Sequence, residues 1–92
     1  MISYGEQFVL EGVENELDKA ILKHRPMNSF HEGYAVIKKE LDELWNEIKK
    51  QKPDLDKLRT EALHVAAMGA RFYLDLVLVE ESYDPEKTGE TR

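Results

Sequence analysis

Two short pairs of side chains in this 92-residue chain have the types and the spacing of a metal or acid–base site. Glu40 and Glu43 are three residues apart, and so are Glu61 and His64. Side chains three apart on a helix share a face. On a helical wheel of about 100° per residue, Glu40, Glu43 and Glu47 lie about a quarter-turn from the centre of the apolar stripe. This pattern predicts that they sit at the edge of a core and not on its far solvent side.

The turn between the two pairs brings them level. Pro53 disfavours helical geometry in the residue before it, so the chain turns just ahead of this proline. In an antiparallel hairpin with this turn, positions whose numbers add to about 104 lie at the same height. Glu43 matches Glu61 on this rule, and Glu40 matches His64. We therefore expect three carboxylates and one imidazole to face a common space.

Such a cluster points to a divalent metal. Carboxylates in a partly buried space repel one another and raise each other's pKa values. A divalent cation removes that cost, and glutamate oxygens suit magnesium or manganese. Helical bundles with inward glutamates and an i, i+3 pair also form two-metal carboxylate sites. The alternative from spacing alone is that these glutamates pair with nearby lysines on a wet helix face.

Three helical segments are expected to position these side chains, over residues 7–24, 29–51 and 54–81, the last opening on an aspartate cap. Ser29, followed three residues later by Glu32, has the arrangement of a capping box. No segment alternates as a strand does. Short loops favour antiparallel neighbours. The predicted fold is an all-α antiparallel helical bundle with three main helices, completed by oligomerisation.

Length and composition restrict the class of protein. The chain fits one domain, which we assign to residues 1–83, with a disordered tail over residues 84–92. The absence of cysteine excludes disulfides, thiolate chemistry and cysteine-ligated metals. A net charge of −6 without a long basic run argues against nucleic acid polymers and anionic membranes as partners. No apolar run approaches the roughly 18 residues of a membrane span, so the expected location is the cytoplasm.

More apolar surface is present than three helices easily cover. A chain of this size buries only about two-thirds of its extended surface, which leaves a monomer marginally stable. The small residues at positions 66, 67, 69 and 70 permit close helix approach, either within the chain or to a second subunit. Residues 74–79 are almost wholly apolar. We therefore expect a homo-oligomer.

The residues around the two pairs resemble a known family. Residues 40–45 read Glu-Leu-Asp-Glu-Leu-Trp, and residues 61–68 read Glu-Ala-Leu-His-Val-Ala-Ala-Met. They resemble the MazG-like nucleoside triphosphate pyrophosphohydrolases, whose signature is Glu-x-x-Glu on one helix and Glu-x-x-Asp on the next, usually with a further Glu just before the first motif. The resemblance covers residues 30–76, about half of the chain, and residues 29–36 look like a branch common in phage and bacterial genomes.

The resemblance implies a ligand set. Glu40, Glu43 and Glu61 fall on the family's magnesium ligands, His64 on its Asp, and Lys39 on the extra Glu. Imidazole suits manganese better than magnesium, so the implied cofactor is Mg²⁺, with Mn²⁺ as the alternative. A histidine ligand must be neutral, so metal binding would weaken in acid.

The resemblance also implies an activity. Members cleave a nucleoside triphosphate between the α- and β-phosphates, giving a monophosphate and pyrophosphate, and they form dimers or tetramers of helical bundles. Glu40, Glu43 and Glu61 would then be catalytic as well as metal-binding, because a carboxylate not fully used as a ligand can accept a proton from water.

Three cations are candidates for binding the substrate's phosphates. Lys39 and Lys50 flank the carboxylate face of the second helix, and Arg71 flanks that of the third. Each also fits an ordinary surface charge. The aromatic residues of the second helix could stack on a base, but their helical spacing favours a place in the core. The stripe that we expect in the core comprises Phe30, Tyr34, Ile37, Leu41, Leu44, Trp45 and Ile48.

Two other functions stay open. One is a catalytically degenerate MazG-like scaffold that binds nucleotides or proteins, which the departures at Lys39 and His64 favour. The other, weaker one is an acidic helical hairpin that regulates a basic protein. Metal titration separates the first from an enzyme, because a degenerate scaffold gains no stability from magnesium or manganese.

Overall fold

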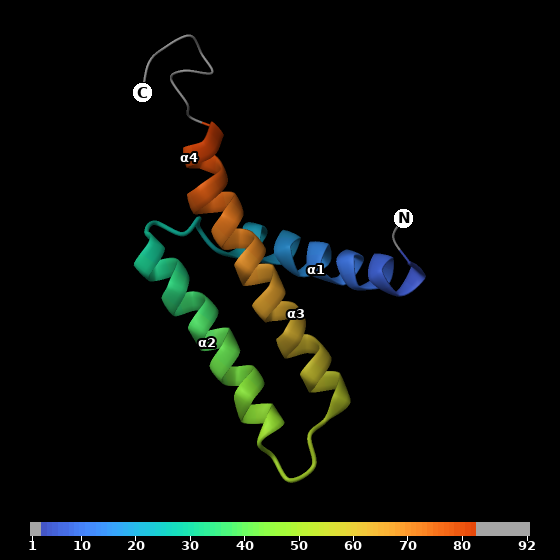
Figure 1. Cartoon of the computed structure of the whole chain (residues 1–92). Coiled ribbons are helices and arrows are strands. Elements are labelled where there is room, and N and C mark those ends of the chain that lie inside the picture. Colours follow the sequence, from blue (N-terminus) through green and yellow to red (C-terminus); the bar gives the residue numbers. More distant parts are fainter. Residues whose placement is uncertain (1–2, 83–92) are drawn as a thin grey trace, which may run out of the picture.

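The computed structural model describes residues 3–82, and within that range all regular structure is helical, as predicted (Figure 1). The tail predicted over residues 84–92 lies outside the described residues, as does residue 83. Two short segments continue the third helix without a break. The elements are α1 (Tyr4–Lys23), α2 (Phe30–Ile48), α3 (Leu55–Phe72), the π-helical turn η1 (Tyr73–Val77) and α4 (Leu78–Ser82).

Side-chain caps determine where α1 and α3 begin. Ser3 Oγ accepts the N–H of Glu6, and the Glu6 carboxylate accepts the N–H of Ser3, which is a complete capping box. This box begins α1 at Tyr4, three residues ahead of the predicted start. Asp54 caps α3 as predicted, accepting two backbone N–H groups of the first turn.

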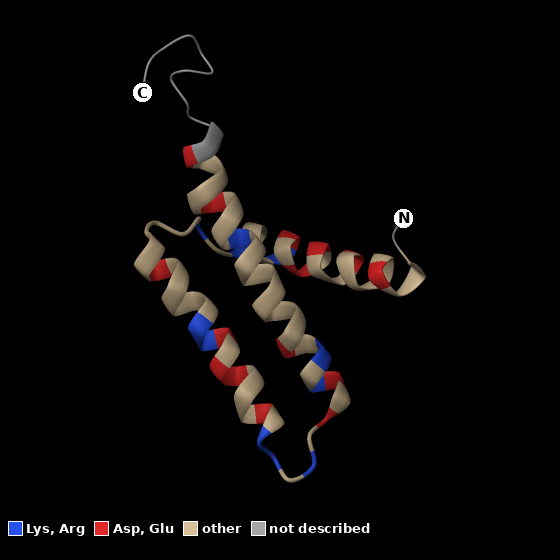
Figure 2. Ribbon diagram, viewed as in Figure 1, with Lys and Arg blue, Asp and Glu red and all other residues tan. Residues whose placement is uncertain are grey.

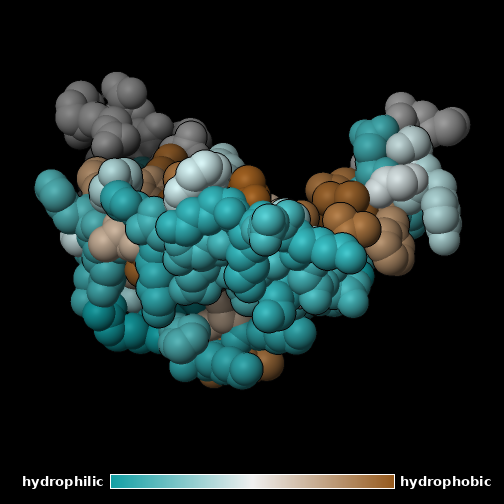
Figure 3. All heavy atoms as spheres, turned by 90° about the horizontal axis from the view of Figure 1, so that it is seen from below, coloured by the Kyte–Doolittle hydropathy of each residue, from teal (hydrophilic) through white to brown (hydrophobic). Residues whose placement is uncertain are grey.

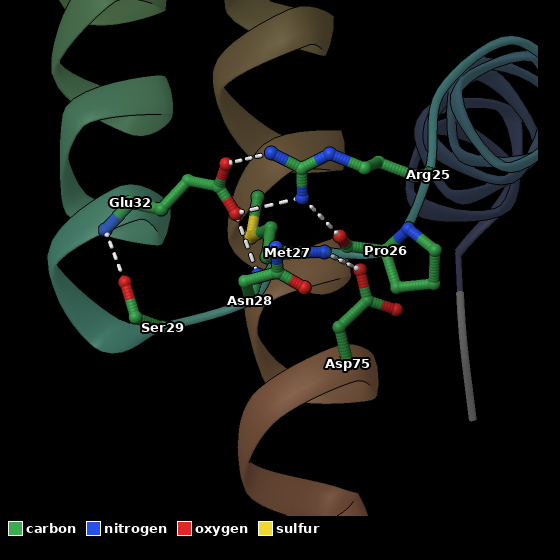
Figure 4. A network of polar contacts seen from close by, with 7 residues as sticks. All are labelled: Arg25, Pro26, Met27, Asn28, Ser29, Glu32 and Asp75. Atoms are coloured by element: carbon green, nitrogen blue, oxygen red, sulfur yellow. Dashed lines mark hydrogen bonds and ion pairs between the residues drawn. The ribbon is translucent and has the colours of Figure 1, made fainter.

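Only half of the capping box predicted at α2 forms. Ser29 Oγ accepts the N–H of Glu32 at 3.0 Å. The Glu32 carboxylate instead accepts the N–H of Asn28 and pairs with Arg25 (Figure 4). Arg25 and Asn28 hold the pKa of Glu32 below its usual value. Glu32 therefore fastens the α1–α2 loop to the first turn of α2.

α2 and α3 form the predicted antiparallel hairpin (Figure 1). Its turn is fastened by the buried carboxylate of Glu47, which accepts the N–H of Asp54 at 2.9 Å and the Lys50 Nζ at 2.8 Å. These two contacts close the turn, and α2 ends at Ile48, slightly before the predicted end near residue 51.

A glycine allows the two hairpin helices to approach at the end away from the turn. A Cβ atom on Gly33 would lie 2.4 Å from Cδ2 of Phe72, so only glycine fits there without a shift. Phe30 stacks on Phe72 with ring centroids 6.0 Å apart. Among the small residues of α3, Ala67 is fully buried, whereas no atom lies within 4 Å of a Cβ built on Gly69. Gly69 therefore serves no close contact within the described chain.

α1 crosses α3 and does not lie along α2 (Figure 1). A Cβ on Gly12 of α1 would lie 3.2 Å from a methyl group of Leu63 on α3, so the two helices approach closely at this crossing. The antiparallel packing expected of sequence neighbours therefore holds for α2 and α3 but not for α1 and α2.

A buried ion pair anchors the α1–α2 loop to the rod formed by α3 and η1. Arg71 is only 4% exposed; it pairs with Asp75 at 2.7 Å and donates to the His24 carbonyl at 3.0 Å. The Asp75 carboxylate also accepts the N–H of Met27 at 3.0 Å (Figure 4). These bonds satisfy both buried charges and determine where the chain leaves α1.

The apolar stripe of α2 is largely uncovered within the chain, so the prediction that it forms the core is wrong for most of its members. The exposed fractions of its five most exposed side chains run from 46% to 64%. The helix instead turns Gly33 and the glutamates toward α3. Large apolar side chains also gather on the projecting arm of α1, while the hairpin turn is hydrophilic (Figure 3). The exposed members of the stripe are Phe30, Tyr34, Leu41, Trp45 and Ile48.

One helical stretch is long and apolar enough to cross a membrane, by length and composition alone. Leu55–Glu80 has 26 residues and a mean hydropathy of 1.5 over its most apolar window. The expectation that no apolar run approaches the length of a span is therefore wrong. Core helices of globular proteins pass the same test. Here the buried pair of Arg71 and Asp75 ties the stretch to the α1–α2 loop, as in a helix packed against protein.

Candidate functional site

His64 on α3 contacts carboxylates from three helices. Its Nε2 lies 3.1 Å from Oε1 of Glu16 on α1, and its Nδ1 lies 3.4 Å from Oε2 of Glu40 on α2. Nδ1 also lies 3.3 Å from Oε1 of Glu61, one turn earlier on α3. Both ring nitrogens therefore face carboxylate oxygens. An imidazolium has an N–H on each nitrogen, whereas neutral imidazole has only one, so the ring can donate to carboxylates on both sides only when it is protonated.

Glu43 and Glu61 interact across the hairpin, as their matched heights predict. Burial raises the pKa of Glu61, and the neighbouring Glu43 carboxyl raises it further, while His64 opposes both effects. The hairpin thus brings together Glu40, Glu43, Glu61 and His64, the four residues expected to share one space.

Glu16 belongs to the same cluster and was missed by the sequence analysis. It forms an ion pair with Lys19 at 3.0 Å, and this lysine, ahead of all other neighbours, lowers the pKa of Glu16. In the sequence, Glu16 and Lys19 look like an ordinary i, i+3 surface pair. Only the crossing of α1 over α3 reveals that Glu16 reaches His64.

One oxygen of the cluster lacks a hydrogen bond. Glu40 Oε2 is buried and accepts none within residues 3–82, and its ion-pair partner His64 is 3.4 Å away. A buried carboxylate oxygen without a donor is costly, so a further cation near it would be favourable. No three acidic or histidine side chains in the described range are already arranged to hold a metal ion. A metal would therefore require side chains of the cluster to rotate.

Of the three cations expected to bind phosphate, only Lys39 remains available. Lys39 lines a pocket of about 590 Å³ that also touches His64, and no carboxylate of residues 3–80 lies within 4.0 Å of its Nζ. Lys50 pairs with Glu47 at the hairpin turn. Arg71 lines the pocket, but its guanidinium is held in the buried loop anchor. For Lys50 and Arg71 the structure favours a structural role over the predicted one.

Acidic and basic side chains form separate bands along α2 (Figure 2). Acidic positions occupy the middle of the helix, a basic band follows on the side toward the α1–α2 loop, and a further acidic position lies between this band and the loop. The carboxylate cluster and the pocket beside it therefore differ in charge while sharing Glu16 and His64.

Comparisons with protein-family models, with curated proteins and with solved structures give no match for this chain. The resemblance to MazG-like enzymes rests on residues 29–36, 40–45 and 61–68 alone.

Proposed function

We propose that this protein is a metal-dependent nucleoside triphosphate pyrophosphohydrolase that cleaves between the α- and β-phosphates. The observation that supports the proposal best is the convergence of Glu40, Glu43 and Glu61 at one level of the hairpin. Three carboxylates held together in a partly buried space suit the neutralisation of phosphate charge through divalent cations. The motif resemblance supplies the substrate class and the bond that is cleaved.

Glu40, Glu43 and Glu61 would hold Mg²⁺ or Mn²⁺, which would neutralise phosphate oxygens and activate a water. Two observations support this fit: Glu40 Oε2 accepts no hydrogen bond within the described residues, and the pKa of Glu61 is raised by burial and by Glu43. His64 contacts Glu40 and Glu61 through one nitrogen. For a cation to bind there, His64 turns away or becomes a fourth ligand.

Glu61 is the best candidate for the general base. A carboxylate whose pKa is raised is a stronger proton acceptor, and Glu61 has this property because of its burial and its neighbour Glu43. In the metal-free chain, Oε1 of Glu61 lies 3.3 Å from Nδ1 of His64. Lys39 lies on the side of the cluster that opens into the pocket, where it would contact the phosphates.

The proposed enzyme is a homo-oligomer. The stripe of five half-exposed apolar side chains on α2 supports this part of the proposal, because contiguous patches of this kind are rare on soluble monomers. Dimer and tetramer are both compatible with a stripe on one helix face.

A second function is a catalytically degenerate scaffold, and one observation favours it. His64 already contacts Glu16, Glu40 and Glu61, so its ring, when protonated, would offset part of the repulsion that a metal would relieve. Such a protein would bind nucleotides or partners without hydrolysing a phosphoanhydride.

A product assay separates the two functions. The chain is incubated with a panel of nucleoside triphosphates in Mg²⁺ and, separately, in Mn²⁺, and release of pyrophosphate is measured. We expect release that Glu43→Gln and Glu61→Gln abolish, while Asp42→Asn, an exposed carboxylate on the same helix, leaves it intact. His64→Asp restores a fourth carboxylate and should increase the Mg²⁺-dependent rate. If neither wild type nor His64→Asp releases pyrophosphate with either metal, the scaffold function is the better account.

A further inference from the structure

A pocket of about 590 Å³ lies where α1, the α1–α2 loop, α2 and α3 meet, on the other side of His64 from Glu40 and Glu61. Its size is within the range of small-molecule sites. We propose that this pocket binds a small polyanion, a polyphosphate group, directly through lysine side chains and without a metal ion. The pocket itself is independent of hydrolysis, but the choice of polyphosphate over other polyanions rests on the proposed function.

The charge of the lining carries the inference. The protein as a whole has a net charge of −6, yet cations outnumber carboxylates around the pocket. A concave site with an excess of one sign of charge attracts ligands of the opposite sign. The lining cations are Lys19, Lys23, Arg25, Lys39 and Arg71, and the lining carboxylates are Glu16 and Glu32.

Two of the lining lysines are available to a ligand. Within residues 3–80, Lys23 on α1 and Lys39 on α2 have no carboxylate within 4.0 Å, and both residues are exposed. They belong to different helices, so a ligand between them would be held from two sides. Lys19 is paired with Glu16 on the solvent-accessible side of α1 and can shift toward an added anion.

The other cations of the lining are held in ion pairs. Arg25 is paired with Glu32 (Figure 4) and Arg71 is paired with Asp75, and these pairs fix the loop that forms one wall. Ala67 and Met68 of α3 contribute an apolar side to the lining. Among the described residues no phenylalanine, tyrosine or tryptophan lines the pocket, and its only rings are the imidazoles of His24 and His64.

The test measures binding of inorganic tripolyphosphate to the full chain in EDTA by titration calorimetry at low ionic strength. We expect saturable binding that weakens with salt. Lys23→Gln and Lys39→Gln should each weaken it about tenfold, the size expected for losing a charge-assisted hydrogen bond. Lys52→Gln in the hairpin turn removes the same charge from an exposed residue outside the lining and should change the affinity less than about twofold.

Two further compounds are titrated to determine which chemical class the pocket binds. Citrate, a polyanion without phosphate, and a nucleoside monophosphate should each bind more weakly than tripolyphosphate. Citrate binding as tight as tripolyphosphate would overturn the assignment to polyphosphate. If tripolyphosphate does not bind without metal, or if Lys52→Gln weakens binding as much as Lys23→Gln and Lys39→Gln do, the proposed binding in this pocket is refuted. Tripolyphosphate binding without any triphosphate hydrolysis would support the binding pocket and refute the proposed enzyme activity. Hydrolysis without metal-free binding would support the enzyme activity and refute the binding pocket.

Discussion

Nε2 of His64 and Oε1 of Glu16 lie 3.1 Å apart, which joins the crossing helix α1 to the hairpin of α2 and α3. The same ring contacts Glu40 and Glu61 through its other nitrogen. One side chain thus links all three long helices at the level of the carboxylates. The contact also means that any change at His64 affects the position of α1 as well as the chemistry of the cluster.

Glu16→Gln should destabilise the protein by about 0.5–1 kcal/mol, the usual contribution of a partly exposed ionic contact. The glutamine keeps the shape but loses the charge that faces both His64 and Lys19. Urea unfolding at neutral pH measures the effect, and Glu14→Gln, an exposed neighbour on α1, is the control. A loss no larger than that of the control would show that the contact of α1 with His64 contributes nothing to stability.

Two glycines should respond oppositely to alanine. Gly33→Ala places a Cβ 2.4 Å from Phe72 and should cost about 1–3 kcal/mol, because the stacked rings cannot easily move. Gly69→Ala meets no atom within 4 Å and should stabilise an isolated chain by about 0.4–1 kcal/mol. Thermal unfolding compares the two variants. If Gly69→Ala destabilises the protein instead, Gly69 faces another subunit.

The hairpin and its site were predictable because local rules determine them. Pro53 and Asp54 fix the turn, and the spacing of Glu43 and Glu61 from that turn then fixes their level. Glu16 was not predictable, since its position depends on the crossing of α1 over α3, which the Arg71–Asp75 anchor helps to set through long-range contacts. Likewise, the spacing of apolar residues predicts the width of the apolar face of a helix, but not which partner covers that face.

The outward direction of the α2 stripe has the same cause. Periodicity predicted a buried face, and the helix does have one, but within the chain that face is formed by Gly33 and glutamates. A helix with polar residues toward its intrachain neighbour and apolar residues outward contradicts the usual pattern for a monomer. The usual pattern, in which apolar residues face a packing partner, holds for α2 if its apolar side packs on a second subunit.

Stability in acid should depend on Glu47. The Asp54 N–H, followed by Lys50, holds the pKa of Glu47 below its usual value in the folded chain. This carboxylate therefore makes its full contribution to the free energy of unfolding above its pKa in the unfolded chain. The contribution disappears as the pH falls through its pKa in the folded chain. Glu47→Gln should lower the free energy of unfolding at pH 7 and reduce its fall between neutral and acid pH. Identical slopes in urea titrations at several pH values would contradict this.

Glu61 should have the opposite effect on the pH dependence of stability. Burial and Glu43 raise its pKa in the folded chain, so its ionised form opposes folding above that pKa and the penalty disappears on protonation. In the absence of metal, Glu61→Gln should therefore raise stability at pH 7, or leave it unchanged, and have little effect well below the usual carboxyl pKa. Unfolding curves in EDTA at the two pH values provide the measurement.

A divalent cation should stabilise the fold, by about 2.7 kcal/mol at one hundred times its dissociation constant. Glu40→Gln should reduce this gain while costing the metal-free protein no more than about 0.5–1 kcal/mol, because Glu40 Oε2 accepts no hydrogen bond within the described residues and makes only the contact with His64. Thermal unfolding with EDTA, Mg²⁺ and Mn²⁺ tests both statements, with Asp42→Asn as the control. A metal-free loss as large as that of a core mutation would make Glu40 structural and exclude it as a ligand.

The α2 stripe should be the contact between subunits, and Trp45 at 56% exposure in the single chain reports on it directly. If a second copy covers the stripe, Trp45 fluorescence is blue-shifted in the wild type, and it shifts red when the protein is diluted below its dissociation constant. Leu41→Glu introduces a charge in the middle of the stripe and should yield monomers in sedimentation velocity, because an unpaired buried charge is costly. Asn46→Glu, on an exposed position of the same helix, adds the same charge and should leave the assembly intact. A folded wild-type monomer at micromolar concentration with a water-exposed tryptophan spectrum would show that the stripe needs no partner, and the oligomer would have to be abandoned.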